Sequence, residues 1–139
     1  MAQKIEEIMT RNPIALEDSS TALDAARAMR DADIGDVIVT SGGAVHGILT
    51  DRDIVVRAVA EGREPSSVRV GDICSSDLVT VSPGDDAVEA VEMMRQKAIR
   101  RLPVVENGNA VGILSIGDLA IERDSESALS DISAARPNN

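Results

Sequence analysis

The sequence Gly47-Ile48-Leu49-Thr50-Asp51-Arg52-Asp53 recurs 65 residues later as Gly112-Ile113-Leu114-Ser115-Ile116-Gly117-Asp118. The same offset aligns residues 5–54 with residues 70–119 without a gap, and 12 of the 50 aligned pairs are identical. Other pairs exchange one residue for a similar one, such as Thr50 for Ser115. Chance similarity rarely stays ungapped over this length, so we interpret the chain as an internal duplication.

Each copy predicts strand, helix, strand, strand and helix in that order. In the second copy, Leu78–Ser82 alternates as a short strand and Pro83-Gly84 predicts a turn. Asp85 and Asp86 then place negative charge where the dipole of a following helix favours it. Helical spacing predicts a buried stripe on that helix, formed by Ala87, Val88, Val91, Met94 and Ala98. The stripe of the first copy is Ala22, Ala25, Ala26 and Met29.

Each copy also predicts a β-hairpin. Asn107-Gly108, a strong two-residue hairpin signal, joins the β-rich runs Leu102–Glu106 and Ala110–Ser115. Gly42-Gly43 stands at the same place in the first copy. A second helix is expected after each hairpin, over Asp51–Glu61 and from Asp118 onward.

These elements predict an α/β (α+β) fold of two tandem repeats. We expect the first repeat at residues 5–61, a linker at 62–69, the second repeat at 70–121 and a C-terminal tail at 122–139. A repeat of about 50 residues exposes too much surface to be stable alone. The two repeats are therefore expected to pack sheet to sheet with pseudo-twofold symmetry, and a ligand site is expected between them.

Composition narrows the function. The 139 residues carry a formal net charge of −10, which opposes nucleic-acid binding because phosphate neutralisation needs a basic face. No apolar run approaches the roughly 18 residues that span a membrane, and the first residues lack a signal-peptide pattern. We therefore expect a cytoplasmic protein. The chain has no aromatic residue, so aliphatic side chains must form both its core and any wall around a bound ring.

The two closing runs resemble the signature of the CBS domain family, a glycine, two apolar residues, Thr or Ser, and an Asp three residues later. The segments Ile8-Met9-Thr10-Arg11-Asn12-Pro13 and Ile99-Arg100-Arg101-Leu102-Pro103-Val104-Val105 look like that family too. The resemblance covers about residues 5–120, and the chain looks like the stand-alone bacterial CBS-pair proteins of the hypoxic-response type. It implies a regulatory Bateman module that binds AMP, ADP, ATP or S-adenosylmethionine, requires no cofactor and forms a homodimer.

The resemblance assigns the ribose of an adenine nucleotide to Asp53 and Asp118. A carboxylate can accept hydrogen bonds from both vicinal ribose hydroxyls. Thr50 and Ser115 each place a hydroxyl where a helix begins and a phosphate is attracted. The alternative for all four side chains is helix capping, and one hydroxyl can serve both roles.

Phosphate also needs cations, because the overall charge of the chain repels it. The candidates are Arg52, Arg100 and Arg101, with solvated surface arginines as the alternative for the last two. The first copy has Gly35-Asp36 in place of Arg100-Arg101. Since Asp36 would repel a phosphate, we expect unequal occupancy, with the first site the weaker.

Adenine would lie between aliphatic side chains. Ile14, Ile34 and Val37 are the candidates in the first copy, and Val79, Ile99 and Leu102 in the second. The alternative for each is a role in the core. Without aromatic stacking we expect an affinity on the order of micromolar, about −8 kcal/mol.

The sequence gives no indication of catalysis. It contains no G-x-S-x-G, H-E-x-x-H, Walker A or C-x-x-C motif. The single histidine, His46, and the single cysteine, Cys74, are expected to be structural, and no metal site is expected. The rival hypotheses are a CBS pair that binds no nucleotide and acts only in dimerisation or protein interaction, and one that binds S-adenosylmethionine.

Overall fold

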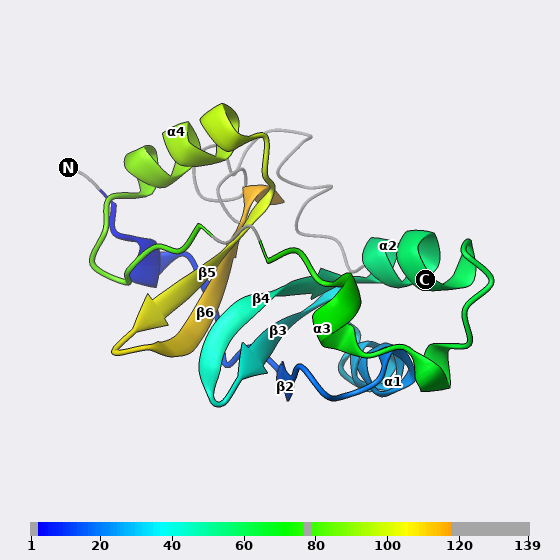
Figure 1. Ribbon diagram of the computed structural model, residues 1–139. Helices are drawn as coiled ribbons and strands as arrows, with labels where there is room; N and C mark the ends of the chain where they lie inside the picture. Colours follow the sequence, from blue (N-terminus) through cyan, green and yellow to red (C-terminus); the bar gives the residue numbers. More distant parts are fainter. Residues whose placement is uncertain (1–2, 77–78, 118–139) are drawn as a thin grey trace. The chain divides into compact units, whose positions relative to one another are not determined.

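The computed structural model describes residues 3–76 and 79–117, and they fold into two compact units (Figure 1). The first-repeat unit spans Ile14–Leu78. The second-repeat unit combines Met1–Pro13 with Val79–Asn139. The predicted ranges follow the duplication in the sequence, whereas the compact units divide the chain near residues 13 and 78.

The first-repeat unit is built on a three-stranded sheet in the order β2-β3-β4. β2 (Ala15–Glu17) pairs in parallel with β3 (Asp36–Ser41), and β3 pairs antiparallel with β4 (Ala44–Thr50). The turn residues Gly42 and Gly43 have φ values of 59° and 86°, the left-handed conformation that a tight hairpin requires. The predicted hairpin is therefore confirmed.

Helix α1 (Ala22–Ala32) covers the core of this unit. It begins at Thr21, whose hydroxyl accepts a hydrogen bond from the Asp24 amide while the Asp24 carboxylate accepts one from the Thr21 amide. Ala22, Ala25 and Met29 are buried and Ala26 partly so, as the predicted stripe requires. Their core partners include Val39, Leu49, Val68 and Ile73.

The predicted second helix of the first repeat is present but changes its winding. α2 (Asp51–Ile54) continues directly into η2 (Val55–Val59), a π-helical turn with a hydrogen bond from the Ala60 amide to the Val55 carbonyl. Gly62 follows with a φ of 71°. Two short helical segments come next, η3 (Pro65–Ser67) and α3 (Val70–Ile73).

The second-repeat unit repeats the hairpin. β5 (Arg101–Glu106) pairs antiparallel with β6 (Asn109–Ser115) through a turn at Asn107-Gly108, as predicted. Both hairpins shift register at matching places, Val39/Thr40 and Val104/Val105. The second helix expected from Asp118 onward lies outside the described residues.

Helix α4 (Ala87–Lys97) begins at Asp86, whose carboxylate accepts a hydrogen bond from the Val88 amide. Ala87, Ala90 and Met94 are buried and Val91 packs partly against the same core. The prediction was wrong for Val88, which is 50% exposed because it follows Ala87 and points about 100° away around the helix. It was also wrong for Ala98, an exposed left-handed residue that ends the helix.

The strand predicted at Leu78–Ser82 is reduced to a single parallel bridge between Val81 and Val104. Leu78 itself lies outside the described residues. In the first repeat the Ile38 amide donates to the Ile14 carbonyl at 2.8 Å. The residue aligned with Ile38 is Pro103, which has no amide hydrogen, so the corresponding bond cannot form.

Each unit is completed by the segment that precedes the other repeat. η1 (Ile5–Glu7) and β1 (Thr10–Arg11) belong to the second-repeat unit, where β1 pairs with β6. The bonds occur in pairs related by the 65-residue offset. The Ile5 amide donates to Asp85 and the Val70 amide to Ser20, both to carbonyls. Likewise, the bridge between Lys4 and Asp86 matches that between Arg69 and Thr21.

Candidate functional site

The strand-to-helix turn after β4 holds two of the predicted site residues. Thr50 is the residue before α2, and its hydroxyl accepts a hydrogen bond from the Asp53 amide at 3.2 Å. The Asp53 Oδ2 atom accepts one from the Thr50 amide at 2.9 Å. The alternative role of these two residues, helix capping, is therefore present, and Asp53 fills it from the first turn of the helix. While it accepts this bond, the Thr50 hydroxyl can still donate its hydrogen to another group.

The other oxygen of Asp53 faces Arg57. Asp53 Oδ1 lies 3.8 Å from Arg57 Nε, and the Asp53 side chain is only 14% exposed. Arg57 Nη1 also donates to the Ile73 carbonyl at 3.2 Å. Arg57 was not among the predicted site residues, although its position four residues after Asp53 on a predicted helix could have identified it.

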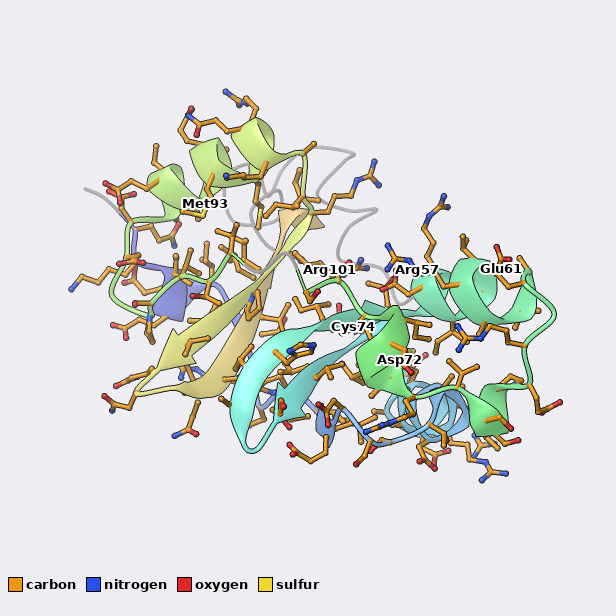
Figure 2. All side chains as sticks on the ribbon, in the orientation of Figure 1. Arg57, Glu61, Asp72, Cys74, Met93 and Arg101 are labelled. Atoms are coloured by element: carbon orange, nitrogen blue, oxygen red, sulfur yellow. The ribbon has the colours of Figure 1, made fainter. Side chains whose placement is uncertain are left out.

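The two repeats place opposite charges beside this turn. Asp36 lies directly across the β3–β4 pair from Thr50, and Arg101 lies directly across the β5–β6 pair from Ser115. The Asp51 amide donates to the Gly35 carbonyl and the Ile116 amide to the Arg100 carbonyl, both at 3.0 Å. The backbone is thus equivalent while an acidic residue in one unit replaces a basic residue in the other. Figure 2 labels Arg101.

The predicted cations differ in exposure. Arg52 is exposed in the first turn of α2, and its amide donates to the Asp51 carboxylate at 2.8 Å. Arg100 is exposed just before β5, and Arg101 is half-buried. Asp118, the predicted ribose ligand of the second repeat, lies outside the described residues.

The predicted adenine-lining residues divide into two groups. Val37 and Leu102 are fully buried and belong to the cores of their units. Their contact with adenine stays a prediction, but their side chains have no exposed surface here to offer a ligand. Four are only partly buried at the edges of those cores and suit a pocket wall better: Ile14, Ile34, Val79 and Ile99.

Within the part of the chain that the structure describes, the buried cysteine and the acidic side chains give no reactive thiolate and no metal centre. Cys74 is buried, and burial raises the pKa of its thiol, so the reactive thiolate is disfavoured. Among the described residues, no group of three or more His, Cys, Asp and Glu side chains is arranged to hold a metal ion. Within the same residues, no helix is long and apolar enough to cross a membrane.

Curated bacterial relatives match this chain over most of their lengths. The CBS domain-containing protein YhcV of Bacillus subtilis is 36% identical over 133 residues, which cover 93% of this chain and 94% of the relative. Hypoxic response protein 1 of Mycobacterium tuberculosis is 31% identical over 115 residues, covering 82% of this chain and 80% of the relative.

Solved structures agree with the fold. The hexameric CBS-CP12 protein from bloom-forming cyanobacteria superposes with a TM-score of 0.81 at 31% identity, covering 89% of this chain and 70% of that chain. The CBS domain pair of protein MJ0100, solved with 5'-methylthioadenosine and S-adenosyl-L-methionine, gives a TM-score of 0.80. Its identity is 19%, with 91% of this chain and 100% of that chain covered, so it shows a likeness of fold.

The CBS domain model matches residues 5–59 and again residues 70–124. These two ranges correspond to the two copies of the duplicated sequence, and together they cover most of the chain. The protein therefore belongs to the CBS domain family, as a pair of tandem CBS repeats.

Proposed function

We propose that this CBS pair is a non-catalytic, cytoplasmic regulatory module that binds an adenine nucleotide. The observation that carries the proposal is the position of Arg101 directly across the strand pair from Ser115, next to the Arg100 carbonyl that accepts from Ile116. Side chains of residues directly opposite each other in an antiparallel pair lie on the same face of the sheet, so an arginine and a serine share that face at the point where β6 ends. Both groups donate hydrogen bonds to phosphate oxygens, and those of arginine are charge-assisted.

The adenosine part would contact residues that each unit already holds in place. In the first repeat, Asp53 uses Oδ2 for the Thr50 amide, which leaves Oδ1 as the ribose acceptor. A carboxylate has about four lone-pair sites, so capping and ribose binding can coexist. Asp118 would take the same role in the second repeat. Ile14 and Ile34, or Val79 and Ile99, would cover the adenine ring.

The charges favour the second repeat for phosphate. Asp36 occupies in the first repeat the place that Arg101 occupies in the second, and Asp51 aligns with Ile116. A nucleotide phosphate would therefore be repelled in one unit and attracted in the other. We infer that AMP, ADP or ATP binds chiefly through the second repeat, with the first repeat as the weaker site.

Thermal unfolding followed by backbone circular dichroism tests this function, since the chain has no Trp or Tyr for fluorescence. A nucleotide at 100 times its dissociation constant adds about 2.7 kcal/mol to the unfolding free energy. For a chain of this size that corresponds to a rise of about 5–10 °C. An unchanged midpoint with AMP, ADP and ATP at millimolar concentration would reject nucleotide binding. A rise in the midpoint with S-adenosylmethionine alone would instead support a CBS pair that binds S-adenosylmethionine.

The alternative, an interaction or homodimerisation module that binds no nucleotide, is favoured by an exposed apolar strip on η2. Val55, Val56 and Val59 are 57%, 44% and 56% exposed. Arg52 precedes the strip and Glu61 follows it, so an antiparallel second copy would place these opposite charges together. Sedimentation equilibrium with and without AMP separates the cases. A dimer that forms equally well in both, together with an unchanged melting midpoint, supports the interaction module.

A further inference from the structure

Arg57 joins two parts of the first-repeat unit that are far apart in sequence. From η2, its guanidinium donates to the carbonyl of Ile73, the last residue of α3, at 3.2 Å. On its other side, Nε lies 3.8 Å from Asp53 Oδ1. Figure 2 labels Arg57 on its helix and Cys74 immediately after α3. One rigid, planar group thus contacts both a helix side chain and the backbone of a distant segment.

The contact falls on the oxygen that matters for binding. Asp53 Oδ2 is occupied by the Thr50 amide, so Oδ1 is the oxygen that a ribose hydroxyl would approach. The ion pair at that oxygen is long, and half of the Arg57 side chain is exposed. Such a pair contributes little free energy, but it restricts the orientations of a carboxylate that is already fixed at its other oxygen.

The segment at the other end of Arg57 is well anchored. The Cys74 amide donates to the Val70 carbonyl at 3.0 Å, and the Ser75 amide donates to the Ile48 carbonyl at 2.9 Å. The chain then continues to Val79, where the second-repeat unit resumes. The residue aligned with Arg57 in the second repeat is Glu122, which cannot donate a hydrogen bond when ionised.

We propose that Arg57 is a positioning residue of the first-repeat site, which aligns Asp53 for the ribose and couples occupancy of that site to the end of α3. The inference rests on the proposed function, because it requires adenosine to bind at Asp53. The coupling is reciprocal: if ligand at Asp53 steadies the Arg57 contacts, those contacts strengthen ligand binding by the same factor.

The test uses the full chain carrying Asp118→Asn, so that adenosine binding reports chiefly on the first repeat. Arg57→Gln should raise the dissociation constant of adenosine about 2- to 5-fold, the value of an exposed ion pair. When Asp53→Asn is also present, Arg57→Gln should add nothing, because its effect passes through that carboxylate. Arg27→Gln, an exposed arginine on α1, is the matched control and should leave the affinity unchanged.

Hydrogen exchange measured on a peptide covering residues 70–75 gives the second readout. Without ligand, Arg57→Gln should speed exchange there about 2- to 12-fold, the value of one hydrogen bond. Adenosine should slow exchange in this peptide in the Asp118→Asn protein. It should have no such effect when Arg57→Gln is also present.

Two results would overturn the inference while leaving the proposed function intact. One is an equal loss of affinity from Arg57→Gln with and without Asp53→Asn. The other is adenosine protection of residues 70–75 that survives Arg57→Gln. If the chain without any substitution binds neither adenosine nor AMP, the proposed function fails. This inference then fails with it, even where ligand-free exchange shows that the Arg57 contact is present.

Discussion

The two repeats share one backbone plan and differ in the chemistry placed on it. Both have a hairpin with the same register shift, a helix that buries two alanines and a methionine, and an incoming segment from the other repeat. Beside the strand-to-helix turn, however, the first repeat has Asp36 and the second has Arg101. The backbone contacts within each unit are thus the same in both repeats, while the charge beside the turn differs.

The incoming segments show why the backbone plan is constrained. Gly47 on β4 faces the Ser75 carbonyl, and Gly112 on β6 faces Met9 and the Thr10 carbonyl. A Cβ atom at either glycine would enter the space of the incoming chain. Glycine at these two aligned positions therefore lets each hairpin accept the segment of the other repeat.

The largest effect should come from filling these two contacts. Gly47→Ala should lower the unfolding free energy by about 3 kcal/mol, because its new Cβ would overlap a fixed backbone carbonyl. Gly112→Ala should cost about 1–2 kcal/mol. There the nearest atom is the flexible Met9 Sδ at 2.6 Å, with the Thr10 carbonyl oxygen at 2.9 Å. Urea unfolding measures both values.

Gly84→Ala is the control for these variants, since nothing lies within 4 Å of a Cβ at that residue. Its unfolding free energy should stay within about 0.5 kcal/mol of the parent. Equal costs for Gly47→Ala and Gly112→Ala would show that the two incoming segments are held with the same rigidity, contrary to the contacts described.

The next effect concerns charge at the two sites. Arg101→Asp should weaken AMP binding about 10- to 150-fold, the value of one hydrogen bond between charged groups. Adenosine binding should change little, because adenosine has no phosphate. Asp36→Arg should act in the opposite direction and strengthen AMP binding by the first repeat. Isothermal titration calorimetry of AMP and adenosine against each variant gives both affinities.

Comparing the two ligands separates charge recognition from unfolding. A variant that loses AMP and adenosine binding equally has lost its fold or its ribose contact, and the arginine assignment would then fail. The assignment would also fail if Arg101→Asp left AMP affinity unchanged in a protein with the parent circular dichroism spectrum.

Local patterns made much of the fold predictable. Asn107-Gly108, Gly42-Gly43 and the acidic residue before α4 act within a few residues, and each forms the predicted turn or helix start. The prediction for Val88 was wrong because Val88 is apolar, as a stripe residue should be, but points about 100° away from Ala87 around the helix. The shortened strand around Val81 was missed because the cause, Pro103, lies in the neighbouring strand and not in the segment itself.

The exchange of segments could not be predicted from such patterns, because it depends on which unit a segment packs against. Ile5 and Val70 are aligned apolar residues in both copies, and nothing local indicates that each is buried in the opposite unit. The site was partly predictable. The Thr50 and Asp53 pair followed from the motif, and the four-residue spacing from Asp53 could have identified Arg57. The contact of Arg57 with the Ile73 carbonyl could not be predicted, because it joins segments that are distant in sequence.

The smallest effect is the titration of Glu17, which should change the first hairpin with pH and leave the second unchanged. The Thr40 hydroxyl and then the Gly42 amide, the latter at 2.8 Å, donate to the Glu17 carboxylate and hold the pKa of Glu17 below its ordinary value of 4.5. A carboxyl group whose pKa is lowered by folding stabilises the fold above its unfolded pKa. That contribution is lost as the pH falls through the lower folded value. Ser82 aligns with Glu17, so the second hairpin has no carboxylate at this position to accept such hydrogen bonds.

Amide NMR shifts recorded from about pH 6 down to about pH 3 should therefore move strongly at Gly42, with a midpoint below the ordinary glutamate value. Asp24 in the same unit also has a lowered pKa, through hydrogen bonds with Thr21. The Gly42 amide therefore reports protonation of Glu17 more specifically than the free energy of unfolding does. Glu17→Gln should abolish the Gly42 titration. If the titration persists in that variant, another group protonates near the turn, and the two hairpins differ for a reason other than Glu17.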